Sequence, residues 1–300
     1  MLLDVAYETL AALGGRLGLD ATARAGELLG AALWRFLPGR RRLAAEAIAR
    51  HLGLDRDAAT DLARRSFAHN ARSFLEIMST SRLDWRFMRD RVRIADPELF
   101  AAFLADSRPL VVASAHLGAW ELSGVLSRLY WRGRPRVVVV RRPRDLALHR
   151  TMLRLRSSSA VRMVEHRNAA FTVLKSLKRK GVVAFLVDHN CSRDEAVFLP
   201  FLGEVAAVNA GPALLAVRSG AVVWPCFLVR EPDGEGRARY AFELHPPLDT
   251  TGLEGSREEK IRRTAIFYTE AVEATVRAHP EQWFWMHRRW KTRPPGEGEG

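Results

Sequence analysis

From Pro109 onward, short apolar runs alternate with longer stretches of helical periodicity, and this alternation limits the possible folds more than any other feature of the chain. The apolar runs are nearly continuous and rich in Val, Leu and Ala, which is typical of strands covered on both faces by crossover helices. We therefore predict an α/β fold, a sandwich with a largely parallel central sheet flanked by helices. The predicted strands are 109–115, 136–141, 161–165, 181–187, 220–229 and 239–245, with antiparallel pairing an option for the last two.

Helical periodicity fills the segments between these strands and also most of the chain before them. The predicted helices are 118–131, 145–157, 168–180, 209–218 and 256–279, preceded by 2–37, 41–51 and 56–80. The economical division is an N-terminal helical extension over 1–80, an α/β domain over 81–294 and a disordered tail over 295–300.

The first helical segment combines apolar and basic character near its end. Trp34 and Phe36 precede three consecutive arginines, Arg40 to Arg42. This pattern is typical of a helical pair that lies on a membrane surface, and an ordinary helical hairpin packed on the domain explains it equally well.

The whole chain is basic, with 47 Lys and Arg residues against 34 Asp and Glu residues and a formal net charge of +13. Such a charge favours polyanionic partners: nucleic acid, an anionic lipid surface, or substrates that carry phosphate or an acidic carrier protein. Charge alone does not choose among them.

No segment predicts a membrane span or a secretion signal. The longest run without Asp, Glu, Lys or Arg is 205–217, which is shorter than the roughly 18 apolar residues that cross a bilayer. Charged residues interrupt the N-terminal segment, and the two cysteines, Cys191 and Cys226, lack the spacing of a redox motif or a zinc site. We therefore expect a reducing, cytoplasmic location.

A histidine and a carboxylate follow the first predicted strand of the sheet. His116 lies just past that strand and Glu121 lies five residues later, at the start of a helix. Ligands bind at this strand end in open α/β sheets, and a histidine there can take a proton from a hydroxyl while a carboxylate holds its other ring nitrogen. A turn through Gly118 has to fold His116 toward Glu121, and backbone N–H groups at the helix start are candidates to hold an oxyanion.

The spacing of this pair is not specific by itself. Random placement of 9 histidines and 34 acidic residues in 300 gives about one such pair, and His189 with Asp194 repeats the interval after another apolar strand. A buried structural histidine is the competing interpretation of His116. No serine-hydrolase elbow, P-loop, zinc-protease or dinucleotide motif occurs in the sequence.

The string Ser-Ala-His-Leu-Gly-Ala-Trp-Glu-Leu over 114–122 resembles the H-x4-(D/E) motif of the lysophospholipid acyltransferase superfamily, in the form seen in lipid A biosynthesis lauroyl/myristoyl acyltransferases. Further matches follow in the family's order over roughly 40–294. They lie at Arg142-Pro143, Arg156, Asp188, 198–203, 211–213 and 280–291.

The resemblance implies a glycerolipid-acyltransferase-like fold and direct acyl transfer. His116 would be the general base toward an acceptor hydroxyl, Glu121 would orient it, and an acyl thioester of acyl carrier protein or coenzyme A would be attacked without a covalent enzyme intermediate, a cofactor or a metal. The implied acceptor is a glycolipid such as a lipid A precursor, with a lysophospholipid or another polar lipid as the alternative. The implied location is the cytoplasmic face of the inner membrane, on an anionic membrane surface.

Four further residues are predicted to bind substrate. Arg142 and Arg156 are cations near sheet ends that suit phosphate, and solvated surface charge is the alternative interpretation. Asp188 is expected either to pair with one of them in the cleft or to form a structural salt bridge, and Gly118 is expected to lie against the substrate. The chain departs from the family at Asp188-His189 and at 205–211, which puts the lipid A acceptor in doubt.

The last predicted element carries an aromatic and basic cluster that includes Trp283, Trp285 and Trp290. Such a cluster suits base stacking and phosphate contacts, but it is more often part of a core or of an interfacial belt. We predict no nucleic-acid partner. A non-catalytic lipid- or nucleic-acid-binding protein of the same fold remains the alternative from another functional class.

Overall fold

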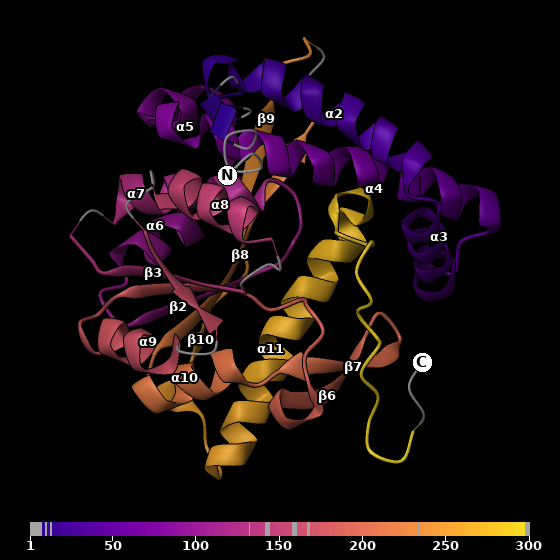
Figure 1. Ribbon diagram of the computed structural model, residues 1–300. Coiled ribbons are helices and arrows are strands. Elements are labelled where there is room, and N and C mark those ends of the chain that lie inside the picture. The colour runs from indigo at the N-terminus through magenta and orange to yellow at the C-terminus, as the bar shows by residue number, and fades with distance from the viewer. Residues whose placement is uncertain are drawn as a thin grey trace.

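The computed structural model describes residues 8–297, except residues 10, 13, 132, 142–144, 158–160, 167–168 and 233–234. Its centre is a sheet of eight strands in the order β1-β9-β8-β2-β5-β3-β4, with β10 paired to β8 (Figure 1). The predicted α/β sandwich with a largely parallel sheet is confirmed. The strands are β1 (Val92–Ile94), β2 (Leu110–Ser114), β3 (Arg136–Val140), β4 (Arg162–Glu165), β5 (Val182–Leu186), β8 (Val222–Glu231), β9 (Arg239–Leu244) and β10 (Leu248–Asp249).

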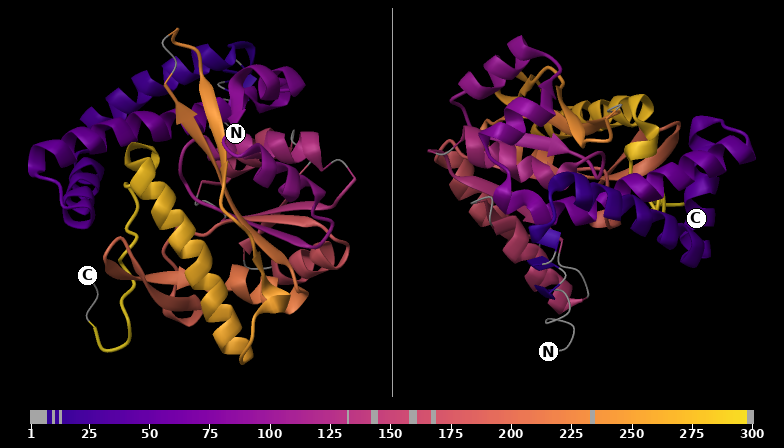
Figure 2. Two further views of the ribbon diagram at one scale, coloured as in Figure 1. Left: turned by 180° about the vertical axis from the view of Figure 1, so that it is seen from behind. Right: turned by 90° about the horizontal axis from the view of Figure 1, so that it is seen from above.

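Helices follow most strands, as the alternating pattern predicted. Strands β8, β2, β5, β3 and β4 are parallel to one another, whereas β9 runs antiparallel to β8. The helices of this part are α5 (Trp85–Arg91), α6 (Pro97–Ala105), α7 (Ser123–Tyr130), α8 (Leu146–Ser157), α9 (Ala169–Lys178), α10 (Gly211–Ser219) and α11 (Arg257–Ala278). Seen from behind, α11 lies alongside the long strand β8 (Figure 2).

The two faces of the sheet pack against different helices, and β2 shows how its sequence serves both. Val111 and Ala113 belong to the apolar core shared with α9, α10 and α11, whereas Leu110 belongs to the core shared with α6 and α7. Successive side chains of a strand point to opposite faces, so a strand covered on both sides has to be apolar at every position.

The N-terminal helices lie across one end of the sheet (Figure 1). They are α2 (Leu19–Phe36), α3 (Pro38–Leu52) and α4 (Arg56–Glu76). Gly26 and Gly30 let α2 approach α4 closely, because a Cβ atom at either glycine would lie 2.5 Å from a backbone Cα of α4. Since Ile48 and Phe67 belong to the same core as the sheet, these helices are packed onto the α/β part of the molecule.

The helical character predicted for 2–37 is interrupted where the chain is described, as a helical pair or hairpin requires. Residues 17–18 are not helical, and α2 begins at Leu19. Within the described residues, no helix is both long enough and apolar enough to cross a membrane. The domain boundaries at residues 80 and 294 stay predictions.

The sequence did not predict the two-stranded sheet formed by β6 (Ala196–Phe201) and β7 (Glu204–Asn209). Its turn places Leu202 and Gly203 at φ values of 51° and 83°. A two-residue hairpin turn with positive φ at both positions is usually signalled by Asn-Gly or Asp-Gly, and a Leu-Gly pair gives no such signal. The strand β7 ends at Asn209, where the predicted helix 209–218 was expected to begin.

Candidate active site

His116 meets Asp188 at the carboxyl end of the parallel sheet. Strands β2 and β5 are paired in register, with Ser114 opposite Leu186, so the residues two positions beyond each strand also lie opposite each other. The Nδ1 atom of His116 lies 2.9 Å from Oδ1 of Asp188, and the backbone N–H of His116 donates to Oδ2 at 2.9 Å. Asp188 therefore holds both the backbone and the ring of His116.

The contact with Asp188 determines the protonation of the His116 ring. Because a carboxylate only accepts hydrogen bonds, the ring proton lies on Nδ1 and the lone pair lies on Nε2. Burial by itself lowers the pKa of His116, but the Asp188 carboxylate outweighs it, and the net pKa is raised above the ordinary value. Burial by itself raises the pKa of Asp188. The charge and hydrogen bond of His116, together with the indole N–H of Trp283, outweigh burial and hold the pKa of the Asp188 carboxyl far below the usual range.

Glu121 does not pair with His116, and this sequence-based prediction is wrong. Its carboxylate instead forms a two-pronged ion pair with Arg156 on α8, with Nε to Oε2 at 3.0 Å and Nη2 to Oε1 at 2.5 Å. The two side chains point in different directions. Glu121 lies in the short 3-10 helix η2 (Trp120–Leu122) and points toward α8, whereas His116 precedes this helix and points toward the end of β5. Glu121 still lies in the site, since it lines the same cavity as His116.

Gly118 forms the turn that the sequence predicted between the histidine and the helix. Its φ is +63°, and a Cβ atom there would lie 2.3 Å from the backbone oxygen of Leu228. Its N–H donates to the carbonyl of Gln282, its carbonyl accepts from the Ser73 hydroxyl, and the N–H of Ala119 donates to Leu228. The amides of Gly118 and Ala119 are therefore not free to hold an oxyanion. That other N–H groups at the helix start do so, and that Gly118 contacts the substrate, stay predictions.

A buried ion pair is connected to this turn through the Ser73 hydroxyl. Arg230 on β8 donates to Glu76 at the end of α4 at 2.5 Å, and both side chains are buried. The Tyr240 hydroxyl also donates to Glu76, while Arg230 donates to the Ser73 hydroxyl that holds Gly118. Because every one of these groups is out of contact with water, the loss of one partner leaves the others unpaired.

Trp283 completes the site from the C-terminal end of the chain. Its indole N–H donates to Oδ2 of Asp188 at 2.9 Å, and its carbonyl accepts from Ser66 on α4 at 2.6 Å. The next residue, Phe284, donates its N–H to the carbonyl of His116. Trp283 and Trp285 are almost fully buried, which confirms the core interpretation of the aromatic cluster. The sequence did not assign Trp283 to the site, although the cluster signalled its burial.

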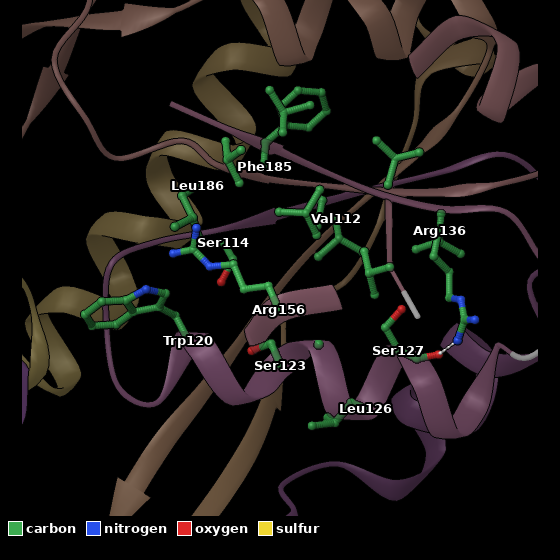
Figure 3. Close-up of a pocket in the computed structure, with 18 of the residues that line it drawn as sticks. Val112, Ser114, Trp120, Ser123, Leu126, Ser127, Arg136, Arg156, Phe185 and Leu186 are labelled. Atoms are coloured by element: carbon green, nitrogen blue, oxygen red, sulfur yellow. Dashed lines mark hydrogen bonds between the residues drawn. The ribbon is translucent and has the colours of Figure 1, made fainter. Parts of the chain in front are cut away.

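An apolar cavity of about 340 Å³ is lined by His116 and extends between the sheet and α7. Figure 3 shows side chains of β2, β3, β5 and α7 that line it. Trp120 and Arg156 lie at one end of the view, and Ser127 and Arg136 at the other. Most of its wall is apolar, with Val112, Leu126, Val138, Met163, Ala184 and Phe242 among the lining residues. The His116 side chain is 33% exposed, and it is placed to act on a molecule at the cavity entrance.

The remaining predicted site residues have different outcomes. Arg142 lies outside the described residues. Arg156 lines the cavity, but its guanidinium is occupied by Glu121, and its binding of substrate stays a prediction. The competing histidine, His189, has its Nδ1 beside the carbonyl of Leu186, and burial lowers its pKa to about 4.

The described residues contain neither a reactive thiol nor a cluster of metal ligands. Cys191 and Cys226 are free and buried, and burial raises their pKa values to about 11 and 12. Among the described side chains, no three of His, Cys, Asp or Glu converge in a way that suits a metal ion. A reaction without a cofactor stays a prediction.

Comparisons with known proteins agree on one family. A family model described as "Bacterial lipid A biosynthesis acyltransferase" matches residues 3–292. The lipid A biosynthesis lauroyltransferase of Escherichia coli (strain K12) is 33% identical over 198 residues, which are 64% of this chain and 59% of that protein. The phosphatidylinositol mannoside acyltransferase of Mycolicibacterium smegmatis is 24% identical over 238 residues, 78% of this chain and 74% of the relative. The lipid A biosynthesis palmitoleoyltransferase of Escherichia coli is 25% identical with the same coverage.

Proposed function

The chain belongs to the bacterial lipid A biosynthesis acyltransferase family, and from this premise we propose that it transfers a fatty acyl group from a thioester to a hydroxyl of a membrane glycolipid. The observation that carries the proposal is the pairing of His116 with Asp188 at the entrance of an apolar cavity. The pairing leaves the lone pair of Nε2 available to a hydroxyl, and the cavity suits an alkyl chain.

The His116 ring can take up and return the one proton of the reaction, so the acyl transfer needs no covalent enzyme intermediate. Nε2 takes the proton of the acceptor hydroxyl while the hydroxyl oxygen attacks the thioester carbonyl carbon. Asp188 stabilises the imidazolium that forms, because its carboxylate is already hydrogen-bonded to Nδ1. The C–S bond then breaks, and the imidazolium gives its proton to the departing thiolate. The buried, protonated state of both cysteine thiols agrees with direct attack by the acceptor.

Glu121 and Arg156 are assigned a supporting role in this proposal. Their ion pair closes one side of the cavity entrance, and the Glu121 carboxylate adds to the field that favours a protonated His116. We propose that the pair fixes the entrance and that Arg156 faces the phosphate of a donor or acceptor with the part of its guanidinium that Glu121 leaves uncovered.

The donor class is a thioester of acyl carrier protein or coenzyme A, and the acceptor class is a glycolipid. The basic net charge suits the acidic carrier or the phosphates of coenzyme A. Two relatives are named for action on lipid A and on a phosphatidylinositol mannoside, which supports a sugar-bearing acceptor over a simple lysophospholipid.

We place the protein at the cytoplasmic face of the inner membrane as a peripheral enzyme. The corner between α2 and α3 exposes Phe36 to 74%, with Leu37 beside it, and Arg35 and Arg42 are exposed arginines close by in the sequence. Exposed apolar side chains together with arginines suit an interface with anionic lipids.

The test is acyl transfer by the purified full chain in detergent-dispersed lipids, with acyl carrier protein and coenzyme A donors offered separately and products identified by mass spectrometry. The His116→Ala variant should form no product, whereas His279→Ala, a change outside the cavity, should retain activity. An active His116→Ala variant would refute the mechanism. A chain that binds lipid but acylates none of the offered glycolipids or lysophospholipids would favour the non-catalytic alternative.

A further inference from the structure

We propose that the hydrogen bond between Arg136 and Ser127 forms the closed end of the cavity and limits the length of the acyl chain that the enzyme accepts. The inference rests on the proposed function, because it assigns the cavity to the acyl chain of the donor. It adds the residues that select among donors.

The cavity runs along the strands, from their carboxyl ends to their amino ends. His116 and Ser114 lie at the carboxyl edge, whereas Arg136 is the first residue of β3 and is paired with Val182, the first residue of β5. Val182 in turn is opposite Leu110, so the cavity runs along β2 from Ser114 to the level of Leu110. Four residue steps at about 3.3 Å each give a length of about 13 Å.

The side chains along this path are apolar, and those in the middle of the strands are only partly buried. Val112, Val138 and Ala184 lie opposite one another on β2, β3 and β5, and each is partly exposed. Their neighbours Val111 and Val183, which point to the other face, are fully buried. The difference shows that the mid-strand side chains border open space that an alkyl chain can fill.

The far end of the cavity has a different chemistry. The Arg136 guanidinium donates from Nη1 to the carbonyl of Ser127 at 3.0 Å, and both residues line the cavity (Figure 3). An alkyl chain that advanced past this point would have to displace a hydrogen-bonded cation, which exchanges favourable polar contacts for none. The guanidinium therefore stops the methyl end of the chain by charge as well as by size.

Two substitutions change the length of the cavity in opposite directions. Arg136→Ala removes the closing group, and the Ser127 carbonyl keeps its bond from the N–H of Trp131, so the end of α7 stays intact. Ala184→Leu adds a branched side chain in the middle of the cavity, opposite Val112 and Val138. Arg218→Ala is the matched control, because Arg218 is an exposed arginine on α10 that does not line the cavity.

The experiment offers the 300-residue chain a series of saturated donors from decanoyl to stearoyl and measures kcat/KM for each. Binding of the corresponding fatty acids is measured in parallel by native mass spectrometry. We expect Arg136→Ala to move the optimum to longer chains and Ala184→Leu to move it to shorter ones. The change should be about fourfold for each methylene gained or lost. Arg218→Ala should keep the wild-type optimum.

The two readouts separate the failure of this inference from the failure of the proposed function. Acyl transfer with the same chain-length optimum in both folded variants would overturn the role of Arg136 while leaving the reaction in place. Absence of acyl transfer in the wild type would count against the proposed function. In that case, the binding of the fatty-acid series would still test whether the cavity selects chain length. Binding that is independent of chain length in all variants would overturn the inference on that readout as well.

Discussion

Asp188→Asn is the change that separates the observed partner of His116 from the one that the sequence predicted. Asp188 accepts hydrogen bonds from the His116 backbone N–H, from the His116 ring and from the Trp283 indole. The first and third converge on Oδ2, so an asparagine has to keep its oxygen there. Its NH₂ group then faces Nδ1 of His116, where the carboxylate oxygen had been.

The expected loss follows from this geometry. An NH₂ donor facing Nδ1 favours the tautomer with the proton on Nε2, and that tautomer has no lone pair for the acceptor hydroxyl. The equivalent change in a serine protease triad lowers kcat by about ten-thousandfold through the wrong tautomer. We expect a fall of about a thousandfold or more in kcat for Asp188→Asn. Glu121→Gln should cost only about tenfold to a hundredfold, because Glu121 contacts Arg156 and not the ring.

The pH profile gives a second readout of the same contact. The base has to be neutral, so activity rises with pH through the pKa of His116, which is raised in the wild type. Asp188→Asn removes the main group that raises this pKa, and the acid limb of kcat/KM should therefore move to lower pH while the maximum falls. Glu121→Gln should move the limb less in the same direction.

The assay is acyl transfer measured across pH for the wild type and both variants, with circular dichroism to check the fold. Equal losses for Asp188→Asn and Glu121→Gln would refute the assignment of Asp188, and so would a larger loss for Glu121→Gln. An acid limb that stays in place in Asp188→Asn would do the same for the pKa argument.

Three further outcomes are expected from the same contacts. Gly118→Ala should destabilise the protein by at least about 3 kcal/mol in urea unfolding, because it adds a backbone clash to the cost of a positive φ, whereas Gly203→Ala, at an open turn, should cost about 1–2 kcal/mol. Glu76→Gln should cost about 3–5 kcal/mol because it leaves the Arg230 cation buried without its partner; unfolding indistinguishable from the wild type would contradict this. Burial raises the pKa values of the Cys191 and Cys226 thiols to about 11 and 12, so a thiol reagent at pH 8 should leave the native protein unlabelled and active.

Local sequence patterns were sufficient for most elements of the sheet. The six predicted strands all exist. Strands β2, β5 and β8 stand out most, because strands buried on both faces read as nearly continuous apolar runs. The elements that were missed carry weaker signals. The β6–β7 hairpin turns on Leu202-Gly203, and the strand β1 has only three residues, from Val92 to Ile94.

Most residues of the site, Trp283 excepted, were also named from the sequence, but their pairing was not. His116, Glu121, Arg156 and Asp188 were all predicted to act in one place, and the structure brings them to one cavity or into direct contact with its residues. The predicted contact between His116 and Glu121 rested on the turn expected through Gly118 and on the resemblance to the H-x4-(D/E) motif. Five residues of separation do not determine where side chains point after a turn.

The sequence by itself determined the α/β class, the position of His116 just past a buried strand and the turn at Gly118, because these depend on periodicity and on local backbone sterics. Only the tertiary structure decided which carboxylate serves the histidine. Parallel pairing of β2 with β5 places Asp188, 72 residues away in the chain, opposite His116, and Trp283 arrives from the C-terminal segment to hold it. The order of strands in a sheet is set by the packing of the whole chain, and no local pattern records it.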